Sequence, residues 1–121
     1  IGDGPGIDVR VFDNPCEFGD SVFAEPATVA VSNDGETWHS FACDADAAPW
    51  GSCAGREPVY LTADDVGPAG DFDPETAGGD GFDLADVGLA EARWVRVTDR
   101  GDLPGFVFDL DAVGIVHGAC P

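Results

Sequence analysis

The sequence contains no lysine and no methionine, and its five basic residues, all arginines, stand against 24 acidic residues. The formal net charge is −19. Binding a phosphate backbone requires clustered basic side chains, so nucleic acid is a poor partner, and anionic lipid surfaces are disfavoured for the same reason. No apolar run approaches the ~20 residues that span a bilayer, so we expect no membrane insertion. These absences leave an anionic domain that either spreads its charge or binds a cation.

The 121 residues are the length of one ordinary domain, and we predict a single domain over residues 1–121. The charge alone would suit a disordered chain, but 44% of the residues are hydrophobic and 10% are aromatic, which favours a folded core. Because the chain starts at Ile1 and contains no methionine, we expect it to be a processed or excised piece of a longer protein.

Hydrophobic periodicity predicts strands rather than helices. Apolar and polar residues alternate every second position, and clusters of glycine, proline and aspartate separate the alternating stretches. The predicted strands are Asp8–Phe12, Thr28–Ser32, Thr37–Phe41, Pro58–Leu61, Arg93–Thr98 and Phe106–Val116. The sequence Ser32-Asn33-Asp34-Gly35 predicts a hairpin turn, because asparagine and glycine accept the positive φ of tight turns.

The predicted fold class is all-β, an antiparallel β-sandwich with long acidic loops. The one helix-like segment is short and runs from about Leu84 to Leu89. The segment from Thr62 to Asp83 is rich in acid and has few apolar residues. Loops of this length in a small domain are usually functional or disordered, and an ordered loop would need its charge neutralised.

The four cysteines predict two disulfides, Cys43–Cys53 and Cys16–Cys120. The first closes a short loop, and the second would join the start of the domain to its end. A zinc site is the alternative, but two cysteines separated by nine residues with no second pair nearby fit zinc poorly. Disulfides place the protein outside the cytoplasm, secreted or at the cell surface.

Candidate metal ligands occur in three groups of acidic residues. The first is the glycine-rich stretch Gly78–Asp86, in which Asp80, Asp83 and Asp86 recur every three residues. Glycine-rich backbone exposes carbonyl oxygens and aspartate supplies charge, as Ca²⁺ requires. The stretch also matches one unit of the calcium-binding β-helix repeat, but those repeats work in tandem and this one stands alone. No twelve-residue loop has the acidic pattern of an EF-hand.

The other two groups lie near the two ends of the chain. Asp109 and Asp111 are two residues apart in a predicted strand and so share a face, where two like charges are costly without a cation or an arginine between them. Asp3 and Asp8 flank the entrance to the first strand. Any one group is explained as well by a solvated loop. Together, the three groups predict at least one bound Ca²⁺.

Enzymatic signatures are scarce, and we expect no enzyme. His39 and His117 are the only histidines, and no nucleophile motif surrounds either of them. Paired carboxylates could serve glycoside hydrolysis, but calcium binding explains them more simply. Trp50 lies between Pro49 and Gly51 inside the predicted Cys43–Cys53 loop. It is the candidate ligand-binding residue, as a stacking platform for a sugar ring; the alternative is that it covers the disulfide.

Several strings occur in the order typical of one group of proteins. They are Asp3-Gly4-Pro5-Gly6-Ile7-Asp8, Val11-Phe12-Asp13-Asn14-Pro15, Glu25–Gly35, Cys43 followed by Cys53-Ala54-Gly55, Ala77–Leu84, Arg93–Asp99 and Phe108–Val113. Together they resemble cell-surface proteins of Gram-negative bacteria, myxobacteria among them, that carry a galactose-binding-like (discoidin-type) β-sandwich. The resemblance implies a jelly-roll fold, display at the cell surface and a structural calcium.

Carried over by position, the resemblance implies six metal-ligating acids: Asp8, Glu25, Asp80, Asp83, Asp109 and Asp111. Domains of that group usually begin with further strands ahead of the Asp-Gly-Pro-Gly turn, so we expect this chain to lack N-terminal strands. A sandwich without them would have an open edge, which a neighbouring chain could complete.

The predicted function is an extracellular calcium-binding surface module for adhesion or recognition, with carbohydrate or other surface proteins as partners. The alternative is a structural subunit of an extracellular filament or sheath that self-assembles by strand exchange. The acidity has a further explanation in adaptation to high salt, where surfaces rich in aspartate and free of lysine are common.

Overall fold

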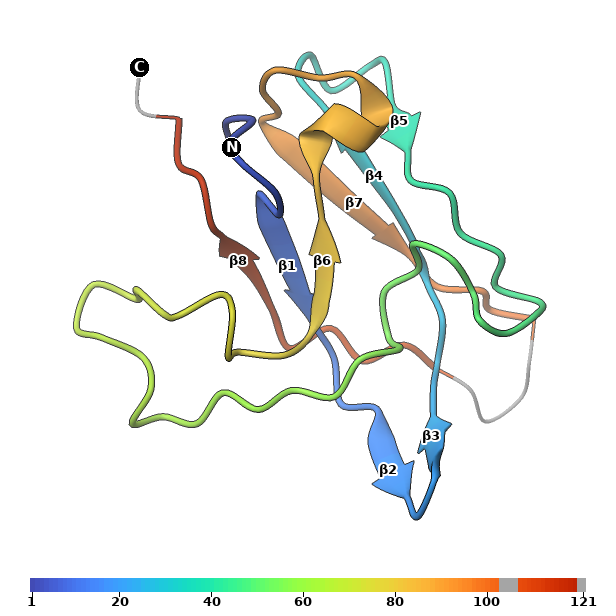
Figure 1. Ribbon diagram of the computed structural model, residues 1–121. Helices are drawn as coiled ribbons and strands as arrows, with labels where there is room; N and C mark the ends of the chain where they lie inside the picture. Colours follow the sequence, from blue (N-terminus) through green and yellow to red (C-terminus); the bar gives the residue numbers. More distant parts are fainter. Residues whose placement is uncertain (103–106, 120–121) are drawn as a thin grey trace.

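The computed structural model describes residues 1–102 and 107–119 (Figure 1). Within these ranges the chain is mostly β, with antiparallel sheets, one short 3-10 helix and no α-helix. The elements are β1 (Val9–Phe12), β2 (Cys16–Phe18), β3 (Ser21–Phe23), β4 (Thr28–Ser32), β5 (His39–Ser40), β6 (Asp80–Phe82), η1 (Leu84–Val87), β7 (Trp94–Thr98) and β8 (Ala112–Ile115). No helix in the described part of the chain is long and apolar enough to cross a membrane.

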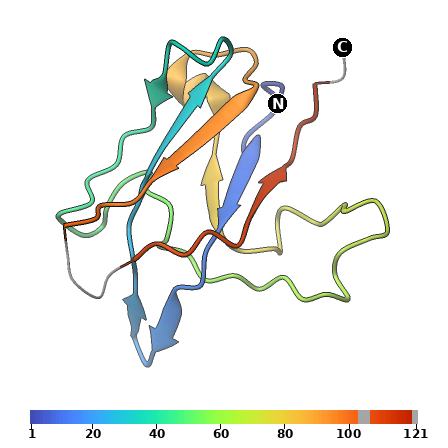
Figure 2. The same cartoon turned by 180° about the vertical axis from the view of Figure 1, so that it is seen from behind.

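Two three-stranded antiparallel sheets form the body of the fold. One sheet has the order β6-β1-β8 and the other β5-β4-β7, while β2 and β3 form a separate hairpin. In the first sheet Val9 pairs with Phe82 on one side and with Ile115 on the other. In the second, Thr28 to Ser32 pair in order with Thr98 to Trp94. Figure 2 shows β4 and β7 side by side, with β6, β1 and β8 beside them and inclined to them.

The hydrophobic core draws on both sheets. Val9 and Val11 of β1 and Val29 and Val31 of β4 are fully buried, as the two-residue period of a strand requires for side chains that share a face. The rings of Phe41 and Phe82 meet with their centroids 4.9 Å apart. The prediction of an antiparallel β fold is confirmed, whereas the described strands do not establish a jelly roll.

The β4–β5 connection is the hairpin that Ser32–Gly35 predicted, but its loop is longer than a two-residue turn. The Ser32 hydroxyl accepts a hydrogen bond from the Gly35 N–H, and the Asp34 carboxylate accepts from the amides of Glu36 and Thr37. Gly35 has a φ of 77°. These bonds hold the pKa of the Asp34 carboxyl well below its usual range.

Several predicted elements are shorter in the structure, and the predicted strand Thr37–Phe41 is reduced to β5, His39–Ser40. The predicted strand Pro58–Leu61 is reduced to one isolated bridge between Val59 and Gly78. The predicted strand from Phe106 yields only β8, and Phe106 itself lies outside the described residues. The predicted helical segment is a single 3-10 turn, capped by Asp83 at its start and by Gly88, with φ 71°, at its end. Between Leu61 and Gly79 the acidic segment forms a long loop (Figure 1), and its Phe72 ring packs on Phe12 of β1 with the ring centroids 5.7 Å apart.

The predicted Cys43–Cys53 disulfide is present, with a Cα–Cα distance of 4.6 Å. The second predicted disulfide is wrong for this structure, because Cys16 is a free, exposed cysteine; Cys120 lies outside the described residues. Strand pairing supplies the reason. β8 runs antiparallel to β1, so Ala119 lies beside Gly2, ahead of β1, while Cys16 lies past the other end of that strand. A disulfide needs Cα atoms within about 7 Å.

Candidate functional site

Three carboxylates meet at the start of β1. One oxygen from each of Asp3, Asp8 and Asp83 lies within 4.8 Å of the others, and this group could hold a metal ion. The β1–β6 register brings two of them together: Val9 is paired with Phe82, so Asp8, just before Val9, lies opposite Asp83, just after Phe82. Asp3 joins them from the N-terminal turn, whose Asp3 N–H donates to the Ala90 carbonyl.

Asp8 is the fixed centre of this cluster, and its side chain is fully buried. Its Oδ1 accepts hydrogen bonds from the Gly4 N–H at 2.7 Å and from His117 Nδ1 at 2.7 Å, and its Oδ2 accepts from the Leu84 N–H at 2.8 Å. Burial acts to raise the pKa of Asp8, but the two backbone bonds and His117 outweigh it and leave the pKa lowered. Asp8 is therefore held as a carboxylate.

The cluster keeps part of its oxygen capacity free for an ion. A carboxylate has about four lone-pair positions, and three on Asp8 are occupied by protein donors. Asp83 uses Oδ1 to cap η1 through the Ala85 N–H, and Asp3 is exposed. All three residues offer oxygen ligands, which suit a hard cation. Asp8 is buried, Asp83 is half-buried and Asp3 is exposed. No ion is identified there.

The other four predicted metal ligands lie elsewhere. Asp80 is buried against Arg56, whose Nε is 2.9 Å from Asp80 Oδ1, and it also accepts from the Arg56 and Glu57 amides. Its charge is thus balanced by an arginine. Asp111 lies beside an apolar cavity of about 420 Å³ between β8 and the acidic loop. Glu25 and Asp109 each lie near Asp13, past the far end of β1.

Asp13 is the acidic residue that sequence reasoning missed. It is 2% exposed, and its Oδ2 has no hydrogen-bond partner among the described residues. Burial raises the pKa of Asp13, and the nearby charges of Glu25 and Asp109 raise it further, against hydrogen bonds from the Asn14 and Asp109 amides. The signal was present in the alternation of β1: Val9 and Val11 point into the core, so Asp13, two residues on, shares their face.

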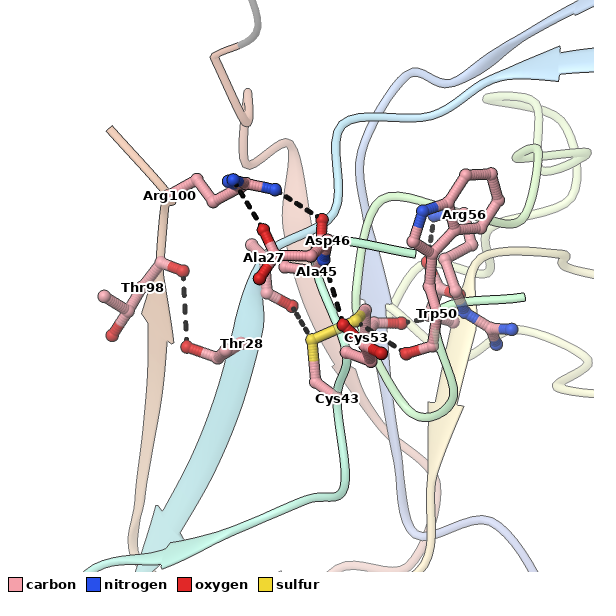
Figure 3. Close-up of a disulfide and its surroundings, with 12 residues drawn as sticks. Ala27, Thr28, Cys43, Ala45, Asp46, Trp50, Cys53, Arg56, Thr98 and Arg100 are labelled. Atoms are coloured by element: carbon pink, nitrogen blue, oxygen red, sulfur yellow. Dashed lines mark hydrogen bonds and ion pairs between the residues drawn. A yellow bond between two sulfur atoms is a disulfide. The ribbon is translucent and has the colours of Figure 1, made fainter. Parts of the chain in front are cut away.

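Trp50 lines a cavity of about 220 Å³ beside the disulfide. The cavity's other lining residues are Ala24, Glu25, Pro26, Ala45, Asp46, Asp99 and Arg100. Trp50 is held by its backbone, since its N–H donates to the Ala47 carbonyl and its carbonyl accepts from the Asp44 N–H, and its φ is 61°. Figure 3 shows Arg100 reaching Asp46, at 2.7 Å, and the Ala45 carbonyl. Trp50, three acidic residues and Arg100 therefore line one small cavity.

Comparison with known proteins adds no relative: no family model, no curated protein and no solved structure matches this chain. What the chain can do therefore has to be argued from its own residues.

Proposed function

We propose that this chain is an extracellular calcium-binding surface module that acts in adhesion or recognition, with glycans as the expected ligand class. The observation that carries the proposal is the convergence of Asp3, Asp8 and Asp83 within 4.8 Å. The Cys43–Cys53 disulfide supports an oxidising environment. We retain the galactose-binding-like jelly roll as the proposed fold, on the resemblance of the sequence motifs.

Calcium is the ion that best fits the Asp3, Asp8 and Asp83 cluster. Ca²⁺ takes six to eight oxygen ligands in flexible geometry, so three carboxylates can be completed by carbonyls and water. Zinc prefers nitrogen and sulfur ligands, and the histidine nitrogen that reaches this cluster, His117 Nδ1, is hydrogen-bonded to Asp8. A bound ion would tie the N-terminal turn, β1 and the cap of η1 together.

A calcium titration tests this function. Chelator is expected to lower the melting temperature (Tm) of the protein and added Ca²⁺ to restore it, because an ion that binds only the folded state stabilises it by mass action. Asp83→Asn should weaken the response, since the amide keeps the cap on Ala85 but removes the charge. Asp86→Asn, an exposed acid of the same turn, is the matched control. A Tm indifferent to chelator would overturn the calcium claim.

The Trp50 cavity supports recognition of a sugar. An aromatic face packs against the apolar side of a pyranose, while Glu25, Asp46, Asp99 and Arg100 offer acceptors and donors to its hydroxyls. We expect binding on a glycan array to be lost in Trp50→Ala and kept in Trp94→Ala. Trp94 is a control because it is 44% exposed on β7 and does not line the cavity. No signal on the array, or equal signals from Trp50→Ala and Trp94→Ala, would contradict the proposal that the chain binds glycans.

A second candidate, a filament subunit assembled from copies of this chain, is supported by β8. Among the described strands β8 pairs only with β1, so its outer edge is open. Val113 and Ile115 on it are 39% and 55% exposed. An open apolar edge is a template for strand addition. Light scattering at rising concentration should show polymers that Ile115→Lys abolishes; a monomer at every concentration would exclude this function.

A further inference from the structure

We propose that Asp13, Glu25 and Asp109 form a second, separate calcium site, completed by the backbone carbonyl of Glu25. It lies past the end of β1, whereas the Asp3, Asp8 and Asp83 cluster lies before its start. Five residues of extended chain separate Asp8 from Asp13, about 16 Å at the usual rise of a strand. One ion therefore cannot serve both groups.

The first step of the argument is the unpartnered oxygen of Asp13. The side chain is 98% removed from solvent, and Oδ2 has no hydrogen-bond partner among the described residues. Buried polar atoms are nearly always bonded, and a buried charged oxygen is costly without compensation. Asp8 shows how this chain treats a buried carboxylate elsewhere, with donors on both oxygens. Asp13 therefore lacks a partner of positive charge.

The second step is that the chain holds two further carboxylates around Asp13. The Asp109 N–H donates to Asp13 Oδ1 at 3.2 Å, which fixes Asp109 beside it. Two residues earlier, the Val107 N–H donates to Glu25 Oε1 at 2.8 Å. The segment from Val107 to Asp109 thus contacts both Glu25 and Asp13. The charges of Glu25 and Asp109 both act on the Asp13 carboxylate, which is unfavourable unless a cation lies nearby.

The third step is the close approach of two oxygens to Gly55. A Cβ built on this glycine would lie 3.1 Å from Asp13 Oδ2 and closer still to the Glu25 carbonyl oxygen. Gly55 has a φ of 80° and its carbonyl accepts the Glu25 N–H. The absence of a side chain therefore lets the Glu25 carbonyl oxygen and Asp13 Oδ2 both lie close to Gly55. Carboxylates and backbone carbonyls are the ligands Ca²⁺ prefers.

Four of the five arginines do not supply the positive charge that Asp13 lacks. Arg56 is paired with Asp80 and Arg100 with Asp46. Arg10 donates to the carbonyls of Gly78 and Gly79, and Arg96 stacks on Trp38 at 4.1 Å. With four of the five arginines engaged elsewhere and no lysine in the chain, a metal ion is the compensating charge.

Isothermal titration of the metal-free full chain with Ca²⁺ tests this site. Asp13→Asn and Glu25→Gln are each expected to remove the same binding event or weaken it about tenfold or more, because each loses a charged ligand but keeps its acceptor for a backbone amide. Asp83→Asn should leave that event intact. Wild-type binding in Asp13→Asn and Glu25→Gln overturns this proposal alone, whereas wild-type binding in Asp83→Asn overturns only the cluster of the proposed function.

A second measurement does not depend on the acidic variants folding. Glu25 and Trp50 line the same cavity, so Tb³⁺ bound at this site should be sensitised by the Trp50 indole. Trp50→Phe is expected to lose most of the sensitised Tb³⁺ luminescence while Ca²⁺ binding by titration stays unchanged, and Trp94→Phe should keep both. Luminescence that survives in Trp50→Phe would place the ion elsewhere and contradict the proposal.

The melting temperature measured with chelator and with Ca²⁺ provides a third test. An ionised, unpartnered Asp13 costs folding free energy when no ion is bound. In chelator we therefore expect Asp13→Asn to have a Tm equal to or above that of the wild type, and in Ca²⁺ a lower one. If Asp13→Asn lowers the Tm equally with and without Ca²⁺, Asp13 is an ordinary structural acid and the proposal fails.

Discussion

Single acidic residues of this chain differ mainly in what compensates their charge. Asp8 is surrounded by donors, Asp80 by an arginine, and Asp13 is left with one unpartnered oxygen. All three are fully or almost fully buried. The sequence predicted both Asp8 and Asp80 as metal ligands. The order of residues shows where acids occur, but it does not show which hydrogen-bond donors reach them in the fold. Arg56, which neutralises Asp80, is 24 positions away in the sequence.

The lowered pKa of Asp8 predicts a specific loss of stability in acid. A carboxyl whose pKa is lower in the folded than in the unfolded state stabilises the fold above its ordinary pKa near 3.8, and this contribution disappears as the pH falls through the folded value. In metal-free protein, Asp8→Asn should cost about 2 kcal/mol at neutral pH, the scale of hydrogen bonds to a charged group. The difference should shrink as the pH falls below 3.8 and through the lowered pKa of folded Asp8.

Urea unfolding at several pH values measures this difference. Asp86→Asn, an exposed aspartate on η1, is the control and should match the wild type throughout. A deficit in Asp8→Asn that is the same at every pH would mean that packing, and not the charge, accounts for the effect.

At the scale of elements, the alternation of apolar and polar residues located several strands correctly. The sequence did not show which strands pair. β1, β4 and β7 lie where the periodicity predicted them, because a side-chain period of two is a local property. The Pro58–Leu61 stretch has strand-like residues but only one bridge, to Gly78. Whether a stretch becomes a strand depends on a neighbour that offers hydrogen bonds along its length, and that neighbour is chosen by the whole fold.

The Cys43–Cys53 bond should stabilise the loop that carries Trp50. On the chain-entropy model a loop of this size contributes about 2–3 kcal/mol, so the double variant Cys43→Ala/Cys53→Ala should lose about that much in urea unfolding. Cys16→Ser is the matched control, and because Cys16 is free and exposed its substitution should change little. Equal losses in the two variants would mean that Cys16 forms a disulfide in solution.

At the scale of the whole molecule, the charge of −19 acts on stability through self-repulsion. Two calcium ions would neutralise four of these charges, so the proposed sites explain particular residues and not the overall acidity. Most of the acid, including that of the loop between Leu61 and Gly79, lies on the surface.

Salt should therefore raise the Tm in chelator-treated protein. If simple screening is the cause, most of the rise should occur by about 0.15 M NaCl, where the screening length falls to about 8 Å. A rise that continues to molar salt would instead favour adaptation to brine. A Tm independent of NaCl would show that repulsion among the surface acids does not destabilise the fold. Differential scanning calorimetry in NaCl at constant pH makes the measurement.

The sequence by itself predicted the antiparallel β character, the Ser32–Gly35 hairpin and the Cys43–Cys53 disulfide, all of which the structure contains. Each of these depends on residues close together along the chain. Only the tertiary structure decided that Asp3 joins Asp8 and Asp83, that Arg56 balances Asp80, and that Asp13 is buried beside Glu25 and Asp109. The reason is physical: carboxylates far apart in sequence meet only when strand register is fixed, and register follows from packing both sheets around one core.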